Sequence, residues 1–113
     1  MEKRPILGLV EDVVIVNGDK KKIVKARIDT GATKSSIDSK LAKELGLGPA
    51  VRERRVKSAH GITMRPLITA TIEINGNMME EEFTIAERTH MTYPMLIGQN
   101  ILKKEKFLVD PLK

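Results

Sequence analysis

The chain has 113 residues, of which 41% are hydrophobic and 31% charged, and its formal net charge is +5. This length suits one modest core, with residues 1–113 as a single domain, and is too short for an enzyme with two catalytic lobes in one chain. The absence of cysteine excludes disulfides and thiolate zinc sites, and the presence of only two Phe and one Tyr argues against nucleic acid as a partner.

Membrane association is not expected from the sequence. No apolar run approaches the roughly 20 residues that a bilayer-spanning helix needs. The first residues, Met1 to Pro5, also lack the apolar core of a signal peptide. We therefore expect no membrane partner and a cytoplasmic location.

The first quarter of the chain is predicted to form a β-hairpin. Apolar residues predominate over residues 5–16, with an interruption expected near Glu11-Asp12. Asn17-Gly18 is a typical turn dipeptide because both residues tolerate positive φ. The second strand covers residues 20–29 and places its apolar side chains on one face. The hairpin therefore ends at Asp29.

The middle of the chain is predicted to hold a short helix and then a long hairpin. Asp38 is a good N-cap for a helix over residues 39–45. Residues 51–58 carry charged side chains on both faces, so this strand cannot sit in a core, whereas residues 62–74 alternate apolar and polar. We expect a hairpin that projects from the core, with its tip at Ala59-His60-Gly61.

The last third of the chain echoes the first. Asn75-Gly76 is a second turn signal, and a strand over residues 78–86 follows, in which Glu80 to Glu82 are interpreted as a solvated face. An apolar strand then breaks at Gly98 into a short helix, and residues 107–109 form a last strand. About seven short strands and one or two short helices predict a mainly β fold, a closed or partly closed β-barrel.

One carboxylate is distinguished by its position. Asp29 follows an apolar strand, and Thr30, Gly31 and Ala32 then turn the chain with small residues. Gly31 tolerates a backbone conformation that a Cβ would resist, and its N–H can donate to the neighbouring acid. This pattern indicates a site. The alternative is an Asx-type turn that only ends the strand.

Two motifs together carry a family resemblance. The segment Ile28-Asp29-Thr30-Gly31-Ala32, with Leu96-Ile97-Gly98 in the last quarter of the chain, resembles the catalytic motifs of the retroviral-type aspartic peptidases, or retropepsins. In that family an apolar-apolar-Gly segment packs beside the catalytic loop, and a pseudo-two-fold axis relates the two. The resemblance implies a retropepsin-like barrel in which the glycine-tipped hairpin is a flap.

A narrower resemblance points to the retropepsin-like family often labelled ATP-dependent zinc proteases, which is associated with enzymes that add glutamates to ribosomal protein tails. It is carried by Arg27 to Ala32, Ser58 to Gly61, Arg65 to Ile68, Met91 to Gly98 and Phe107 to Pro111. The sequence has no His-Glu-x-x-His motif and no phosphate-binding glycine loop, so we expect neither a metal nor a cofactor. Gln99 stands where both families commonly have an arginine, which bears on how a dimer is braced.

The resemblance implies a homodimeric aspartic endopeptidase with Asp29, Thr30 and Gly31 as catalytic residues. One chain supplies one aspartate, so a second copy must supply its partner. Two carboxylates at hydrogen-bond distance share a single proton, so one Asp29 acts as base to a water while the other donates to the peptide carbonyl. Thr30 is expected to bond across the dimer, and the Gly31 N–H to orient the carboxylate.

The resemblance also suggests how a peptide or protein substrate is held. Closure of the flap excludes water from the reaction, and the substrate-binding residues implied are Ala32, Ser58, Ala59, His60, Gly61 and Ile62. Basic residues of the hairpin favour an acidic, glutamate-rich peptide, but a charge run is also typical of a solvated face. His60 and His90 are too isolated to suggest a metal site. The alternative function is a non-catalytic peptide-binding or scaffolding domain with the same fold.

Overall fold

The computed structural model describes residues 4–50, 52–59 and 61–113, which form nine strands and two short helices. No helix within the described ranges is long and apolar enough to cross a membrane. The elements are β1 (Ile6–Leu7), β2 (Val10–Asn17), β3 (Lys20–Ile28), β4 (Ser36–Asp38), α1 (Ser39–Glu44), β5 (Arg52–Ser58), β6 (Gly61–Ile74), β7 (Asn77–Ala86), β8 (Met95–Ile97), α2 (Gln99–Lys104) and β9 (Leu108–Val109). The sequence predicted about seven strands, because it joined β1 to β2 and gave no signal for the three residues of β4.

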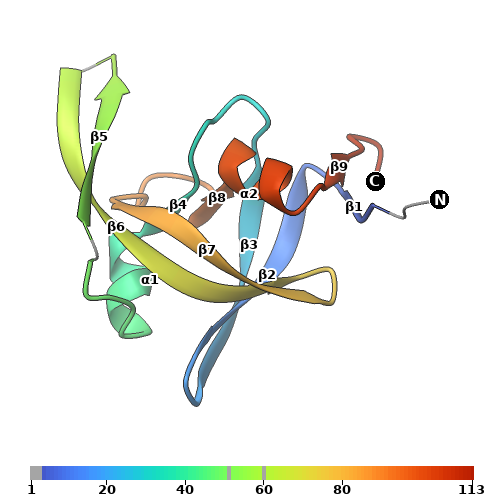
Figure 1. Ribbon diagram of the computed structural model, residues 1–113, viewed down its shortest axis with the longest axis horizontal. Coiled ribbons are helices and arrows are strands. Elements are labelled where there is room, and N and C mark those ends of the chain that lie inside the picture. Colours follow the sequence, from blue (N-terminus) through green and yellow to red (C-terminus); the bar gives the residue numbers. More distant parts are fainter. Residues whose placement is uncertain (1–3, 51, 60) are drawn as a thin grey trace.

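Six of the strands close into a barrel. Their order is β2-β3-β8-β4-β7-β6, and the antiparallel pairing of β6 with β2 returns the sheet to its start. Strand β5 is added outside this ring by pairing with β6. Closure satisfies backbone groups that an open sheet would leave exposed at its edges. The prediction of a mainly β, closed barrel with two short helices and a projecting hairpin is confirmed (Figure 1).

The barrel consists of two halves with the same layout. Each half is a hairpin, a connection, a three-residue strand and a six-residue helix, namely β2-β3-β4-α1 and β6-β7-β8-α2. Strand β3 is parallel to β8 as β7 is parallel to β4, and β2 pairs with β6 and β4 with β8 in antiparallel fashion. The pairing scheme is therefore unchanged when the halves are exchanged, as an approximate two-fold relation requires.

Both predicted tight turns are present. Gly18 has φ 62° in the two-residue loop that joins β2 to β3. In the second hairpin Asn75 has φ 53° and Gly76 has φ 81°, the left-handed pair that matches the twist of flanking strands. Asn17 is the last residue of its strand and pairs with Lys20, so the first turn is Gly18-Asp19, one residue later than the sequence predicted. The turn residues thus fix the register of both hairpins.

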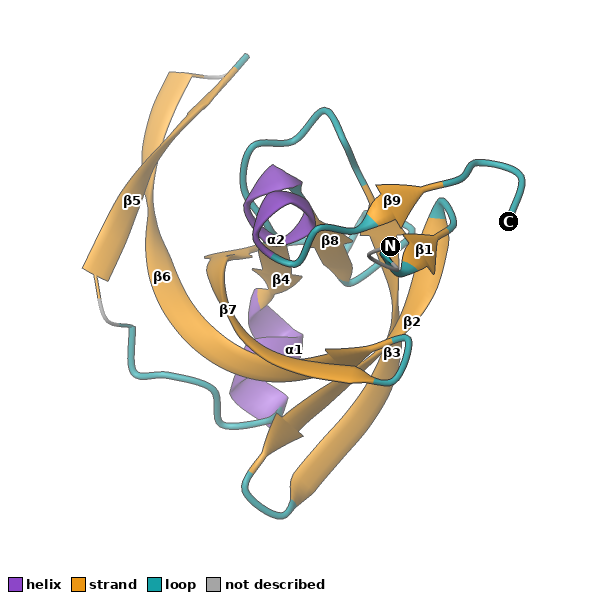
Figure 2. Ribbon diagram, turned by 45° about the vertical axis from the view of Figure 1, so that its right-hand side comes forward, coloured by secondary structure: helices purple, strands orange, loops and turns teal. Residues whose placement is uncertain are grey.

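Strand β6 changes its role along its length. Its second half alternates, with Ile68, Ala70, Ile72 and Ile74 buried in the barrel core. Its first residues pair with β5 outside the barrel, where Ile62 and Met64 stay exposed. Figure 2 shows the long strand bending round the barrel and continuing into this β5–β6 arm. The predicted projecting hairpin is the arm.

Two details of the sequence interpretation are wrong. Glu11 and Asp12 lie inside β2, and the break between the first two strands falls at Gly8 and Leu9 instead. The three glutamates of β7 are not one solvated face, because Glu81 is only 3% exposed. A strand turns alternate residues to opposite faces, so a run of like residues cannot all face solvent when one face is buried.

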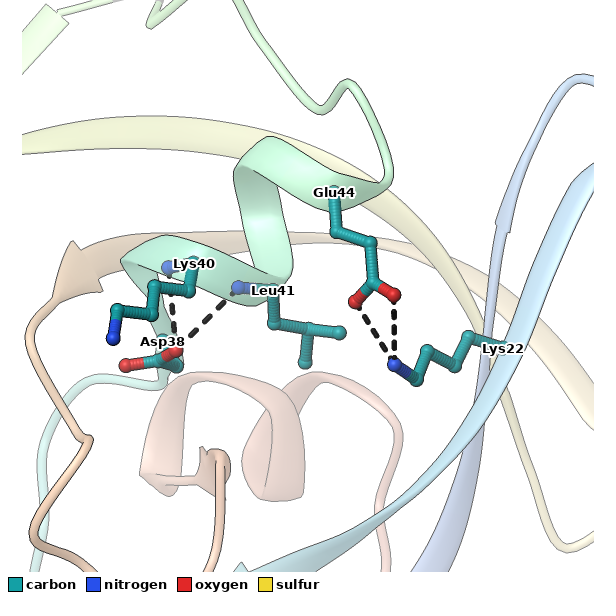
Figure 3. Close-up of polar contacts among 5 residues, drawn as sticks. All are labelled: Lys22, Asp38, Lys40, Leu41 and Glu44. Carbon is teal, nitrogen blue, oxygen red and sulfur yellow. Dashed lines mark hydrogen bonds and ion pairs between the residues drawn. The ribbon is translucent and has the colours of Figure 1, made fainter.

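Helix α1 begins at a carboxylate with several roles. Asp38 Oδ2 accepts hydrogen bonds from the backbone N–H groups of Lys40 (3.2 Å) and Leu41 (3.4 Å), as the sequence predicted for an N-cap (Figure 3). Its other oxygen accepts the Arg88 N–H at 2.7 Å, from the segment that follows β7. Asp38 therefore ties the start of α1 to the end of the second hairpin.

Removing this cap should destabilise the protein more than removing a surface ion pair on the same helix. Asp38→Ala leaves backbone donors unpaired and is expected to lower the free energy of unfolding by about 1–2 kcal/mol. The control is Glu44→Ala, which removes the Lys22–Glu44 pair (2.8 Å, Figure 3), where both side chains are about half exposed. Such pairs contribute less than about 1 kcal/mol. Urea unfolding measures both, and equal losses would contradict the capping role.

The two ends of the described chain meet beside the barrel. Strand β1 runs parallel to β9, with Leu108 N–H donating to the Pro5 carbonyl (2.9 Å) and Asp110 N–H to the Leu7 carbonyl (2.8 Å). Figure 2 shows this pair on the side of the barrel away from the β5–β6 arm. The loop from β3 to β4 lies between the β1–β9 pair and the β5–β6 arm in the view of Figure 1.

Candidate active site

Asp29 stands where β3 leaves the barrel. Its backbone N–H donates to the Ile97 carbonyl at 2.9 Å, which extends the pairing of β3 with β8 by one residue. Its side chain is half-buried, and Oδ1 accepts the Gly31 N–H at 2.9 Å. The Asp29 carbonyl accepts the Ala32 N–H at 3.3 Å, which closes the turn. The contact between Gly31 and the carboxylate, expected from the sequence, is present in the structure.

The first residues of α2 hold the loop of residues 29–35, called here the Asp29 loop. Gln99 Nε2 donates to the Thr30 carbonyl and the Gln99 backbone N–H to the Ala32 carbonyl, both at 2.7 Å. The next N–H, of Asn100, donates to the Thr33 carbonyl at 3.2 Å. The glutamine that occupies the usual arginine position therefore braces this loop within its own chain.

A buried serine fixes the far end of the same loop. Ser35 is 1% exposed, and its hydroxyl donates to Asn100 Oδ1 at 2.7 Å and accepts the Gly98 N–H at 2.8 Å. Gly98 passes so close to the loop that a Cβ would overlap the Lys34 carbonyl. Sequence patterns assigned no role to Ser35 or Asn100, because partners 65 residues apart leave no local signal.

A cavity of about 520 Å³ lies between the Asp29 loop and the arm. Figure 1 shows the arm and the loop beside each other at the top of the view. The walls of the cavity come from the loop, the middle of the arm, β7, β8 and the segment after β7, with lining residues Gly31, Ala32, Thr33, Lys34, Ser35, Ser36, Arg55, Val56, Lys57, Arg65, Thr84, Arg88 and Leu96. The structure thus brings the predicted flap hairpin and the predicted catalytic loop to one cavity.

Among the described residues, those predicted at the tip of the hairpin do not line this cavity. Ala59, Gly61 and Ile62 are exposed at the end of the arm, and Ser58 pairs with Gly61. His60 lies outside the described residues. Of the six residues assigned to substrate binding, Ala32 is the one in the cavity wall among those that the structure describes. The role of the tip residues stays a prediction.

The cavity is lined by positive charge. Lys34, Arg55, Lys57, Arg65 and Arg88 are in its wall, and none of the described lining residues is acidic. Burial lowers the pKa of Arg88; the Asp38 carboxylate opposes this, and the positive charges of Arg65 and Arg27 add to it. Like charges that repel one another around a cavity make it a favourable place for an anion.

Arg88 is held in place by neutral oxygens. Its Nη1 donates to the Ser36 hydroxyl at 3.1 Å and its Nε to the Tyr93 carbonyl at 3.0 Å. Within the described ranges, none of its nitrogens forms an ion pair with a carboxylate. The guanidinium is therefore oriented toward the cavity wall without being neutralised there. Sequence reasoning did not single out this arginine, because only the fold brings the segment after β7 to the arm.

A carboxylate in this position can do acid–base chemistry. Ionised, it can take a proton from a water, and protonated it can donate one to a carbonyl oxygen. The described residues contain no group of three or more His, Cys, Asp or Glu side chains arranged to hold a metal ion.

Comparisons with solved structures concern the fold. A crystal structure of a protein of unknown function from Legionella pneumophila matches with a TM-score of 0.71 and 18% identity, over 98% of this chain and 96% of that one. The EIAV protease, solved in complex with the inhibitor HBY-793, matches with a TM-score of 0.66 and 21% identity, over 92% of this chain and 89% of that one. At these identities the fold is shared with retroviral proteases.

Comparisons of sequence give the family. A protein from Shewanella pealeana named probable alpha-L-glutamate ligase is 33% identical over 118 aligned positions, which cover 78% of this chain and 24% of that protein. The chain therefore spans about a quarter of the length of this relative. The model of the family described as retropepsin-like aspartic endopeptidase RimB matches residues 40–113, a range that begins after the Asp29 loop. By this match, and with the fold of a retroviral protease, the chain belongs to the RimB-like family of retropepsin-like aspartic endopeptidases.

Proposed function

We propose that two copies of this chain form an aspartic endopeptidase whose active site contains one Asp29 from each copy. The observation that carries the proposal is the Asp29 carboxylate, oriented by the Gly31 N–H on a loop locked to β8 and α2. Rigid placement matters because acid–base groups must lie within hydrogen-bond reach of the reacting atoms. Each chain supplies one Asp29 to the proposed site, so a second copy is needed to supply the other catalytic carboxylate.

The reaction follows from two carboxylates that share one proton. The ionised Asp29 removes a proton from a water, whose oxygen attacks the peptide carbonyl, while the protonated Asp29 donates to the carbonyl oxygen. Collapse of the tetrahedral intermediate breaks the C–N bond, and the leaving amine takes a proton from the pair. Peptide cleavage by the wild-type chain and by an Asp29→Asn variant tests this function directly.

The face for the second copy is proposed to include the terminal strands. An apolar cavity of about 580 Å³ lies next to Thr30 and is lined by Arg4, Thr30, Gln99, Leu102, Lys103, Phe107, Leu108 and Val109. Ile6 and Leu108, on the paired strands β1 and β9, are 45% and 42% exposed. Apolar surface beside Thr30 supports a partner here, because covering it would bring a second Asp29 loop close to the first.

The proposed substrate is an acidic, glutamate-rich peptide. The five cations of the cavity wall support this, because a carboxylate placed among them would relieve their repulsion and form charge-assisted hydrogen bonds. The name of the relatives, probable alpha-L-glutamate ligase, fits a glutamate-containing peptide in the same setting. The arm is proposed to close over such a peptide as a flap.

Arg65→Gln should weaken binding of an acidic peptide by roughly 10-fold, since a hydrogen bond to a charged group contributes about 1.5–3 kcal/mol. Arg65 is half-buried in the cavity wall, and its side chain forms no hydrogen bond or ion pair with the described residues. Calorimetry in an Asp29→Asn background measures affinity without turnover. The control is Arg52→Gln, on the same arm, whose guanidinium pairs with Glu82 at 3.2 Å outside the cavity. Equal effects of both changes, or an equal loss with a neutral peptide, would count against the acidic substrate.

The second candidate is a peptide-binding domain that keeps the fold and does not cleave. It is favoured by the family match, which starts at residue 40 and so does not include Asp29. In that case acidic peptide binds to the cavity with the same dependence on Arg65, and no cleavage is found in the dimer. Turnover that depends on Asp29 separates the two functions.

A further inference from the structure

A buried carboxylate on β7 faces α2, the helix that holds the Asp29 loop. The Glu81 side chain is 2% exposed, on the barrel side of β7, while its neighbours Glu80 and Glu82 are exposed. Burying an ionised carboxylate is costly unless it is fully paired. The environment of Glu81 therefore decides which protonation state the fold accepts.

Two charged side chains at the C-terminal end of α2 face Glu81. Lys104 Nζ lies 3.1 Å from Glu81 Oε1, but the ammonium also donates to the Glu80 carbonyl, and Oε1 accepts no hydrogen bond from the described residues. The half-buried Glu105, which caps α2, is the second neighbour. Strand β6 adds no charge, since Ala70 pairs with Glu81 and Thr69 lines the cavity beside it.

Glu81 changes its charge near neutral pH. Burial raises the pKa of Glu81 to about 7, a hydrogen bond with the Glu105 carboxyl acts in the same direction, and Lys104 opposes both. Protonated Glu81 can donate to Glu105 and join β7 to α2. Ionised Glu81 puts two carboxylates side by side, so the same contact becomes repulsive.

The opposite end of α2 holds the Asp29 loop. Asn100 and Glu81 line one cavity of about 410 Å³. Asn100 Nδ2 donates to the Glu82 carbonyl at 3.1 Å, while its Oδ1 accepts the Ser35 hydroxyl. The helix has only six residues, so a shift of its C-terminal end also moves Gln99 and Asn100.

We infer that Glu81 is a positioning residue: in its protonated form it docks α2 on β7, and through α2 it keeps the Asp29 loop in place. Ionisation weakens the docking and lets the loop move. The effect on the reaction rate rests on the proposed peptidase function, whereas the effects on stability and on loop motion do not.

Thermal melts of the full chain test the docking. The unfolded chain ionises Glu81 near pH 4.5 and the folded chain near pH 7, so the folded state holds more protons between these values and stability falls as pH rises through this window. Glu81→Gln keeps the shape and the donor and has no proton to lose. We expect the Tm of Glu81→Gln not to fall as pH rises through this window, and at about pH 8 to exceed the wild-type Tm by at least about 4 °C.

Two further variants test whether Glu81 causes the loss of stability with rising pH. Glu80→Gln removes an exposed carboxylate from the same strand and should follow the wild type. Lys104→Met removes the charge that lowers the pKa of Glu81, so its loss of stability with rising pH should be larger than in the wild type. Parallel melts of the wild type and Glu81→Gln across the pH range would overturn the inference.

Hydrogen exchange tests the link to the loop. The N–H groups of Gln99 and Asn100 donate to loop carbonyls, so their exchange, corrected for intrinsic rates, should accelerate about 10-fold or more above pH 7 in the wild type and not in Glu81→Gln. Altered melts with unchanged exchange at these amides would make Glu81 a stabilising residue only and refute the positioning role.

The reaction rate gives a separate readout. With a cleaved peptide, kcat of the wild type should show a fall with a midpoint near 7 in addition to the alkaline limb set by the shared proton of the Asp29 pair, and Glu81→Gln should keep only the limb of the Asp29 pair while KM stays unchanged. An identical fall near 7 in both proteins would contradict the inference. If neither protein cleaves, the proposed function fails, and the melts and exchange still decide the role of Glu81.

Discussion

Asp29→Asn is expected to abolish peptide cleavage, by about 10³-fold or more, and to leave the fold and the dimer intact. The amide keeps the shape of the carboxylate, and its oxygen can still accept the Gly31 N–H. It can neither take a proton from water nor hold one for the peptide carbonyl. Cleavage of an acidic peptide, followed by mass spectrometry, measures the loss. The control is Asp19→Asn in the exposed turn between β2 and β3, which should cleave at the wild-type rate.

Mixing the two proteins tests whether the site is shared. If each dimer needs two Asp29 carboxylates, random exchange with an equal amount of Asp29→Asn chain lowers the wild-type rate to about half. The rate should also fall on dilution, as dimers dissociate. A rate that is unchanged by both would place catalysis within one chain and contradict the dimeric site. Full activity of Asp29→Asn would end the aspartic mechanism.

Gly98→Ala is expected to lower the free energy of unfolding by at least about 3 kcal/mol, a large effect for the addition of one methyl group. A Cβ there would overlap the Lys34 carbonyl and lie 2.8 Å from the Ala32 carbonyl oxygen. Both contacts are backbone, so neither can be relieved by a rotamer change. The φ of Gly98 is −106°, so the cause is contact and not backbone conformation. Loss of that size is a large part of the stability of a small domain.

The matched control for Gly98→Ala is a glycine in the loop itself. At Gly31 the one neighbouring atom within 4 Å of an added Cβ is Asp29 Oδ1 at 3.3 Å, the end of a side chain that can move. Gly31→Ala should therefore fold, with a loss in urea unfolding well below that of Gly98→Ala. Similar unfolding midpoints for the two variants would contradict the close packing of Gly98 against the Asp29 loop.

The local elements could be predicted because their signals lie within a few residues. Asn75-Gly76 adopts the left-handed pair that a tight hairpin needs, and Asp38 caps α1. The alternation of β6 predicted a strand, and the charged side chains on both faces of β5 predicted that the hairpin projects from the core. Even the echo between the halves was visible, since an Asn-Gly turn, a strand and a glycine-containing motif recur in the same order.

The face on which a charge lies was harder to predict. Glu80 to Glu82 look alike in sequence, yet only Glu81 points into the barrel under α2. Buried ionisable groups are rare, so a run of glutamates is normally interpreted as surface. Here the register of β7 against β6 overrides composition, because it fixes which alternate residues face the core.

The sequence by itself determined the strands, the turns, the cap of α1 and the placement of Asp29 at a strand end, since each depends on conformational preferences of neighbouring residues. Tertiary structure alone decided what surrounds that aspartate. Ser35 meets Gly98 and Asn100 across more than sixty positions, Gln99 reaches the Thr30 carbonyl, and Arg88 meets the arm. These contacts follow from closure of the barrel, which brings distant segments to one end of the molecule and is not encoded in the spacing of any single motif.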